Sequence, residues 1–281
     1  MLHSTAGADP TGVGIQAYRG QLGKGQSGLA LLDVVDVTVR FGGIVALDSL
    51  SFQIDEGQIC GLIGPNGAGK TTMFNVVSRI YQPTSGRIRF GGTELLDVPA
   101  HGIAKLGIAR TFQNLALFPS MTVLENVMVG AHSVSRQNWL TSSLRIGTRA
   151  EDEELTIRAA AILRRLGLER YAFRPCAGMP YGTLKRIELA RAMAASPRLL
   201  LLDEPASGLT HAEVDELGAT VRKLRDDFGL TVLLVEHHMQ MVMGISDNVV
   251  VLDFGRKIAE GPPAVVRDDR AVIEAYLGSP V

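Results

Sequence analysis

The chain has 281 residues, enough to bury a substantial core without help from disulfides or metal ions. Its 28 Lys and Arg against 29 Asp and Glu leave a formal net charge of −1, which gives no overall positive field for a phosphate backbone, so nucleic acid is not an expected partner. The two cysteines, Cys60 and Cys176, have no spacing suited to a metal site or a disulfide framework, which fits a reducing cytoplasm.

The longest apolar runs, at 199–202 and 231–235, are too short to span a bilayer, so no transmembrane segment is expected. Residues 1–29 hold seven glycines and no continuous apolar stretch. This composition predicts a flexible N-terminal tail over 1–29, followed by one domain over 30–281.

From Ala30 the chain shows short β-branched and apolar runs, which predict strands over 31–41, 44–47, 50–54 and 58–64. A glycine-rich loop follows the last run directly. The next segment, 72–80, has apolar residues at helical spacing and ends before Pro83. The unit is therefore a strand, a glycine loop and a helix.

The middle of the chain, from 116 to about 180, predicts a helical lobe with helices over 122–134 and 151–166. In the second helix the apolar residues Leu155, Ala159, Ile162, Leu163 and Leu166 share one face. After Gly182 helices and strands alternate, with helices over 184–194 and 211–228 and strands over 198–203, 231–236 and 248–253. This alternation predicts an α/β fold with a mostly parallel sheet that the helical lobe interrupts.

The glycine loop carries the pattern GxxxxGK[ST], which is typical of a phosphate-binding P-loop. Its backbone N–H groups and the following helix N-terminus can converge on the phosphates of ATP, while the lysine reaches the β and γ phosphates and Thr71 holds Mg²⁺. The bland alternative is a glycine turn that only joins strand to helix. The predicted nucleotide-binding residues of this loop are Gly64, Pro65, Asn66, Gly67, Ala68, Gly69, Lys70, Thr71 and Thr72.

A second acidic element, LLLLDEP, places Asp203 and Glu204 at the carboxyl end of an apolar strand, the edge where parallel sheets bind ligands. We expect Asp203 to hold Mg²⁺ directly or through water. Glu204 is expected to accept the proton of a water aligned with the γ-phosphate.

Together these motifs resemble those of the ATP-binding cassette (ABC) ATPases, over nearly all of the chain from 31 to 280. The resemblance implies a RecA-like P-loop core, an antiparallel β subdomain and an inserted helical lobe. It makes Gln113 a residue that touches the metal or attacking water, the SGL run at 207–209 the D-loop, and His237 the histidine that contacts the γ-phosphate. His238 is expected to begin the next helix. Phe41 lies where the family stacks an aromatic ring on adenine, although a strand-end aromatic can instead belong to the core.

The family's signature motif departs here from its common LSGGQ form and reads MPYGT at 179–183. Pro180 replaces a serine, Thr183 replaces a glutamine, and Thr210 stands where an aspartate is common. In the family this motif caps a helix whose N-terminus points at the nucleotide of the opposite subunit. Tyr181, Gly182 and Thr183 are therefore expected to face a partner's ATP. The alternative is a degenerate second site.

A PYG signature followed by KRIELARA, together with the C-terminal VIEAYLG, resembles the ATPases of branched-chain amino-acid importers. The resemblance implies two ATPase subunits, identical or paralogous, closing head to tail on a membrane permease at the cytoplasmic face. A periplasmic or extracellular substrate-binding protein is the indirect partner. The alternatives are a urea or amide importer, a lipopolysaccharide-type exporter, or a module that binds ATP, dimerises and barely hydrolyses it.

The apolar stretch after Gln113 is expected to receive the permease. Packing of the same side chains into the lobe's own core is the rival interpretation. The residues concerned are Leu115, Leu117, Phe118 and Met121.

Overall fold

The computed structural model describes residues 30–111, 115–131 and 148–277. Its larger sheet has six strands in the order β10-β9-β3-β8-β7-β6. Every pairing is parallel except that of β10 with β9. The strands are β3 (Ile59–Ile63), β6 (Ile108–Arg110), β7 (Leu199–Asp203), β8 (Thr231–Val235), β9 (Asn248–Asp253) and β10 (Arg256–Gly261).

A second, antiparallel sheet has the order β2-β1-β4-β5. The separate strands predicted over 44–47 and 50–54 are wrong, because they form one strand. Its backbone continues through Asp48 and Ser49, where the Asp48 N–H donates to Gly255 O and the Ser49 N–H to the Thr38 hydroxyl. The strands are β1 (Leu32–Phe41), β2 (Ile44–Ile54), β4 (Ser85–Phe90) and β5 (Thr93–Glu94).

Two apolar clusters form the core, one on each face of the larger sheet. The alternation along β3 divides its side chains between them: Ile59 and Ile63 join one cluster, Cys60 and Leu62 the other. A strand buried on both faces reads as a continuous apolar run, which is why 58–64 shows no polar alternation. The P-loop follows this strand, so it stands on one of the most buried elements of the molecule.

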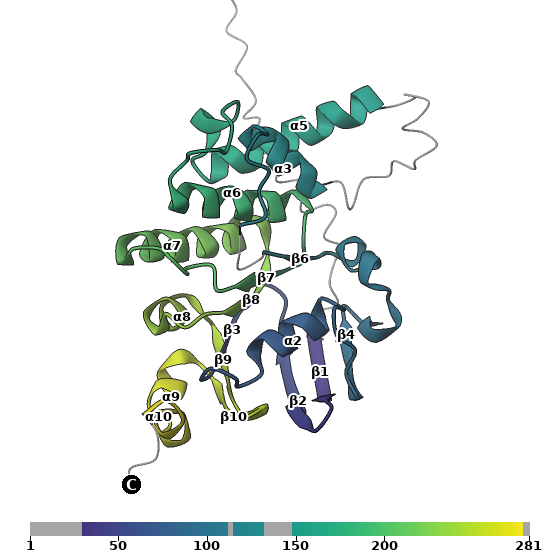
Figure 1. Cartoon of the computed structure of the whole chain (residues 1–281), viewed down its shortest axis with the longest axis vertical. Helices are drawn as coiled ribbons and strands as arrows, with labels where there is room; N and C mark the ends of the chain where they lie inside the picture. Colours follow the sequence, from purple (N-terminus) through teal and green to yellow (C-terminus); the bar gives the residue numbers. More distant parts are fainter. Residues whose placement is uncertain (1–29, 112–114, 132–147, 278–281) are drawn as a thin grey trace, which may run out of the picture.

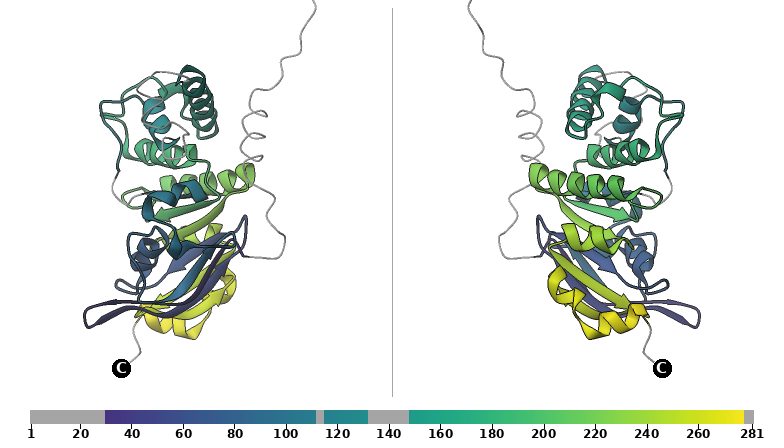
Figure 2. Two further views of the ribbon diagram at one scale, coloured as in Figure 1. Left: turned by 90° about the vertical axis from the view of Figure 1, so that its right-hand side faces the viewer. Right: turned by 90° about the vertical axis from the view of Figure 1, so that its left-hand side faces the viewer.

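The helices cover both faces of the larger sheet, and α3, α5 and α6 form a helical lobe at one end (Figures 1 and 2). The antiparallel sheet lies at the opposite end, where β2 is next to β10, and α9 and α10 contact β10. The α-helices are α2 (Lys70–Val77), α3 (Val123–Ala131), α5 (Thr148–Arg165), α6 (Tyr181–Ala194), α7 (His211–Phe228), α8 (Met239–Ile245), α9 (Pro263–Arg267) and α10 (Arg270–Leu277). Short 3-10 turns are η1 (Leu95–Asp97), η2 (Ala100–Gly102), η3 (Ala104–Leu106) and η4 (Glu169–Tyr171).

The α/β prediction, with its mostly parallel sheet, antiparallel subdomain and helical lobe, is confirmed. The helix predicted over 211–228 has the bounds of α7, because Thr210 and Glu213 form a capping box at its start and Gly229 ends it in a left-handed conformation. The predicted tail 1–29 and Gln113 lie outside the described residues. No described helix has the length and apolar character needed to cross a membrane.

Candidate functional site

The glycine loop folds as a tight turn because its backbone passes close to two neighbouring segments. Gly64 has φ 152° and Gly69 has φ 104°, both in the region that L-residues avoid. A Cβ on Gly69 would lie 2.6 Å from Ala46 O, and one on Gly64 would collide with Leu252 O. These two positions therefore require glycine, which explains their place in the motif.

Lys70 begins α2 and folds back over the loop. Its Nζ donates to Gly64 O at 2.7 Å and to Pro65 O at 2.9 Å. Partial burial lowers the pKa of this ammonium, and the negative charge of Glu204 opposes that shift. The amine thus sits at the centre of the loop, where a phosphate would replace its hydrogen bonds to neutral carbonyls with an ion pair.

A hollow of about 350 Å³ opens in front of the loop. Its lining brings together the antiparallel sheet, the P-loop with the start of α2, and Glu204 from beyond β7. The lining residues are Ile44, Val45, Ala46, Asn66, Gly67, Ala68, Gly69, Lys70, Thr71, Thr72, Glu204 and Phe254. Lys70 and Glu204 are 134 positions apart in the sequence, and both line this pocket. The structure therefore brings the two predicted motifs together.

Asp203 ends β7 and Glu204 follows it, and the two side chains lie in different environments. The Asp203 side chain is 8% exposed, and its Oδ2 accepts a 2.7 Å hydrogen bond from the Arg110 guanidinium. Glu204 has φ 45°, a conformation that costs a non-glycine residue free energy, and its N–H donates to Val235 O at 2.8 Å. The turn sends the carboxylate of Glu204 away from the strand direction and into the pocket lining.

His237 follows β8 and lies beside Glu204. Its side chain is 56% exposed, with Nδ1 4.0 Å from Glu204 Oε2 and 3.7 Å from Glu236 Oε2, and it is not among the residues that line the P-loop pocket. His238 is the N-cap of α8, as expected, and its Nδ1 lies 3.1 Å from the buried carboxylate of Glu236. The two adjacent histidines therefore have different roles in the fold.

Glu236 and Arg110 are the residues that sequence reasoning missed. The side chain of Glu236 is fully buried, and it accepts the N–H groups of Ala206, His237 and His238. Each lies near a predicted residue in the sequence: Glu236 directly precedes His237, and Arg110 lies three residues before Gln113. A charged residue inside an otherwise apolar or motif-rich run is the pattern that could have indicated them.

Phe41 lies at the end of β1 and is 45% exposed, so the interpretation of Phe41 as a core residue is wrong. Its ring meets Tyr81 edge-on, with centroids 5.2 Å apart. Its hairpin partner Ile44 lines the pocket, although Phe41 itself is not among the lining residues. Adenine stacking on Phe41 stays a prediction.

The signature residues begin α6. Tyr181 is 42% exposed, whereas Thr183 is 6% exposed and its N–H bonds to Pro180 O at 3.0 Å. Gly182 and Thr183 line a separate hollow of about 60 Å³ beside α7. Among the described residues that line the P-loop pocket, none belongs to 179–183.

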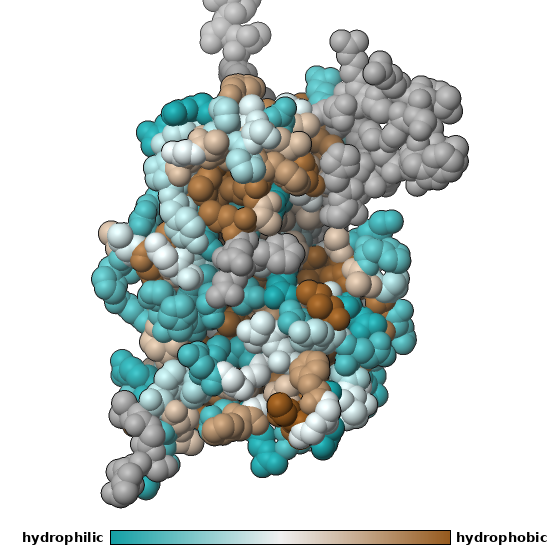
Figure 3. Space-filling model, viewed as in Figure 1, coloured by the Kyte–Doolittle hydropathy of each residue, from teal (hydrophilic) through white to brown (hydrophobic). Residues whose placement is uncertain are grey.

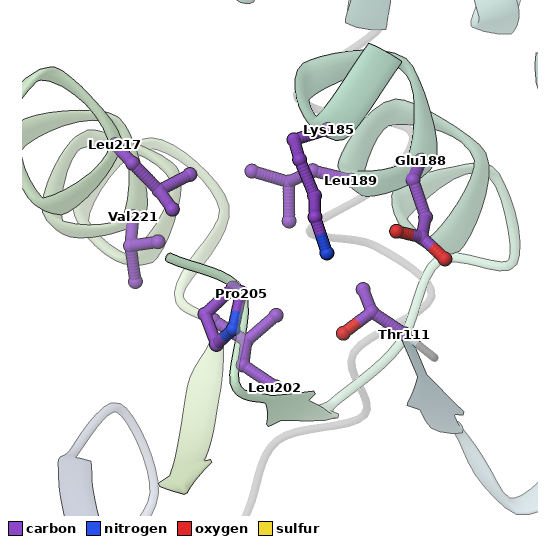
Figure 4. A pocket seen from close by; sticks show the side chains of 8 residues that line it. All are labelled: Thr111, Lys185, Glu188, Leu189, Leu202, Pro205, Leu217 and Val221. Carbon is purple, nitrogen blue, oxygen red and sulfur yellow. The ribbon is translucent and has the colours of Figure 1, made fainter. Parts of the chain in front are cut away.

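The inner face of α6 lies opposite Leu202 and Pro205, the residues on either side of Asp203 and Glu204 in the sequence (Figure 4). Lys185 and Glu188, 5% and 3% exposed, point from α6 toward Pro205 and Thr111. A space of about 10 Å³ remains between them and α7, enough for one water molecule at most. The signature helix is thereby tied to the same loop that places Glu204.

The residues predicted to receive the permease lie partly in the core and partly at the surface. Leu117 packs against the lobe core, whereas Phe118 and Met121 are 46% and 37% exposed. The buried amide of Asn126 holds their loop by bonding both the N–H and the carbonyl of Phe118. Apolar side chains gather on the helical lobe in the face shown in Figure 3.

A family model described as ABC transporter matches residues 47–207, and one described as Branched-chain amino acid ATP-binding cassette transporter matches 256–281. The high-affinity branched-chain amino acid transport ATP-binding protein BraF of Pseudomonas aeruginosa is 44% identical over 249 residues, covering 88% of this chain and 98% of its own.

Solved structures agree. The ADP conformation of an ATP-binding cassette of an ABC transporter has a TM-score of 0.78 and 29% identity, covering 89% of this chain and 100% of that one. A dimeric post-hydrolysis cassette bound to ADP and Pi has a TM-score of 0.68 and 25% identity, covering 83% and 98%. The chain therefore belongs to the ABC transporter family and is one of its ATP-binding, ATP-hydrolysing subunits.

Proposed function

We propose that this ATPase drives uptake of branched-chain or other hydrophobic amino acids, through MgATP binding and hydrolysis at the interface of two ATPase subunits. The identity to BraF over nearly the whole chain, and the match of the C-terminal segment to a branched-chain amino acid transporter model, support this cargo class. Urea, amides and exported lipids are the alternative cargoes, and a lack of ATP-dependent leucine uptake would favour them.

The main support for an ATP site shared between two subunits is that one chain holds two separate halves of such a site. Lys70, Thr71 and Glu204 line one pocket, while the start of α6 lines another. A nucleotide in the first pocket has an open side, because its hollow is bounded by described residues of the P-loop half only. A second subunit, placed head to tail, would close that side with Tyr181, Gly182 and the α6 N-terminus. The buried side chain of Thr183 makes its backbone the more suitable contact.

The donor set fits Mg²⁺, because Thr71 offers an exposed hydroxyl beside the pocket and Asp203 a carboxylate, and hard cations prefer oxygen ligands. The cation would neutralise phosphate charge and orient the γ-phosphate. Gln113, which lies outside the described residues, is proposed as a further ligand.

Each remaining role in the reaction is assigned to a group of this chain. The P-loop N–H groups and Lys70 hold the β and γ phosphates, and Phe41 is proposed to stack on the adenine. Glu204 orients water and accepts its proton, and His237, 4.0 Å from Glu204, contacts the γ-phosphate. Loss of that phosphate removes the contacts that hold the two subunits together.

For partners and place we propose a permease docked on the exposed loop of Phe118 and Met121, at the cytoplasmic face of the membrane. The second ATPase subunit is a copy of this chain or a paralogue, and a substrate-binding protein outside the membrane delivers cargo to the permease. The domain is proposed to extend over 30–281, with its helical insertion at about 116–180 and a tail at 1–29.

Light scattering in MgATP tests the composite site. Glu204→Gln keeps the shape of the side chain but cannot accept the proton, so the variant is expected to accumulate as a dimer while wild type does not. A Glu204→Gln, Lys70→Ala double variant, which lacks the cation that holds the phosphates, is expected to stay monomeric. A nucleotide-loaded Glu204→Gln protein that remains monomeric would contradict the symmetric dimer and favour a paralogous partner.

Uptake of radiolabelled leucine tests the cargo. The chain is expressed with permease and binding-protein subunits from its own genome, and vesicles are compared with and without Lys70→Ala. We expect ATP-dependent leucine uptake that the substitution abolishes. Uptake of urea but not leucine would overturn the proposed cargo.

A further inference from the structure

Arg110 lies at the junction of three elements of the ATP site. It ends β6, and its Nη2 donates to Asp203 Oδ2 at the end of β7, 2.7 Å away. Its Nη1 donates to Asn75 Oδ1 on α2, the helix that follows the P-loop, at 2.8 Å, and to the hydroxyl of Ser78, the C-cap of that helix, at 3.1 Å. One guanidinium therefore connects Asp203 with the phosphate-binding helix.

The Arg110–Asp203 pair is buried, unlike the other arginine–carboxylate pairs of the described residues. Its side chains are 13% and 8% exposed, whereas those of Arg165 and Asp227 are 29% and 26% exposed. The guanidinium also lies over the Phe74 ring, 5.6 Å from its centroid. A carboxylate at this depth is unfavourable without a positive partner, because water cannot solvate it.

The geometry points to Arg110 as the positioning residue of Asp203: it holds Oδ2 and supplies the positive charge that this carboxylate needs when no metal ion is near. This inference rests on the proposed role of Asp203 at the Mg²⁺ site. The fork of the guanidinium fixes the direction of the carboxylate and the distance between β7 and α2. Lysine cannot reproduce that, because its ammonium is a single point donor.

A consequence follows for the coupling between metal and stability. Removal of Arg110 leaves Asp203 buried without a counter-charge, so the metal-free protein becomes much less stable. Mg²⁺ with nucleotide restores a positive charge beside the same carboxylate. The metal should therefore stabilise a variant without Arg110 more than it stabilises wild type, and this excess should vanish when Asp203 is made neutral.

Thermal unfolding measures this coupling without recourse to activity. Wild type, Arg110→Met, Asp203→Asn and the double variant are each melted in ADP with EDTA and in ADP with Mg²⁺. We expect Arg110→Met to lower the Tm in EDTA by roughly 5 to 10 °C and to about double the increment that Mg²⁺ provides. The double variant should regain most of the lost Tm and lose the excess of its Mg²⁺ increment over that of wild type. Arg165→Met, which removes a more exposed pair whose residues do not line the P-loop pocket, should keep the wild-type increment.

Two outcomes would overturn the inference. One is an equal Tm loss in both buffers that Asp203→Asn does not rescue, which would make Arg110 only a tie between elements. The other, should Arg110→Met not fold, is a double variant that also fails to fold. Arg110→Lys then serves as the charged comparison, with an expected Tm between those of wild type and the double variant. If wild type itself shows no Mg²⁺ increment, the proposed metal site fails, while rescue by Asp203→Asn in EDTA still tests the counter-charge.

Discussion

The substitution Glu236→Gln isolates the contact between the segment after Glu204 and the histidine after β8. Glu236 Oε1 accepts the Ala206 N–H at 2.7 Å, and Oε2 accepts those of His237 at 2.8 Å and His238 at 3.0 Å. Glutamine has the same shape but only one acceptor oxygen. Its favoured orientation keeps that oxygen on the two histidine N–H groups and places its own NH₂ against the Ala206 N–H.

The magnitude follows from that count. One charge-assisted hydrogen bond is lost in a fully buried site, and one backbone N–H is left facing another donor. The expected cost is roughly 2 to 4 kcal/mol of unfolding free energy, or a Tm about 5 to 12 °C lower. The distance between Glu204 and His237 is no longer held, so kcat should fall by roughly ten- to a hundredfold.

The assay is a set of steady-state ATPase measurements, calorimetric ATP binding and thermal melts on the same preparations. ATP affinity should stay within about twofold, since Glu236 does not line the P-loop pocket. Glu56→Gln serves as the matched control, because Glu56 is an exposed carboxylate paired with Arg198 at 3.1 Å. A Glu236→Gln protein with unchanged Tm, or with ATP affinity reduced as much as kcat, would refute the reasoning.

Other substitutions test single features. Phe41→Ala should weaken ATP binding by about 1 kcal/mol if adenine stacks there. Because Phe41 is 45% exposed, the melting temperature should not change. Calorimetry measures the binding and thermal melts the stability, and an equal loss of stability would contradict the stacking. Phe118→Asp should spare basal ATPase activity yet prevent copurification with the permease, whereas Phe173→Asp, at an 82% exposed position outside the loop, should not. The backbone N–H and hydroxyl of Thr210 lower the pKa of Glu213 below its ordinary 4.5. A depressed folded-state pKa gives stability that is present above pH 4.5 and is lost as the pH falls through the lower value. The stability advantage of wild type over Glu213→Gln in urea titrations should therefore disappear toward pH 3, and an advantage that persists there would contradict it.

The choice of Phe118 over Leu117 depends on burial that the pattern of apolar residues could not show. Leu117 packs against the lobe core, so a charge at that position would destabilise the lobe as well as any docking surface. Phe118 is exposed on a loop held by Asn126. Copurification therefore reports on docking only for the second position.

The sequence by itself determined the P-loop, the acidic pair after β7 and the alternation of helices and strands. Each depends on short-range effects: glycine's freedom at Gly64 and Gly69, the capping box of Thr210 and Glu213, and the continuous apolar runs of strands buried on both faces. Such features are complete within a few residues, so their order along the chain is enough to place them.

Only the tertiary structure decided which charged residues support that chemistry. Arg110 reaches Asp203 across 93 residues, and Glu236 reaches Ala206 across 30. Both contacts exist because the sheet order places β6 and β8 on either side of β7, and alternation along a chain does not specify that order. A lone arginine or glutamate beside a motif reads as a solvated charge until its burial is known. Long-range pairing, which depends on the whole sheet, turns these two residues into supports of the ATP site.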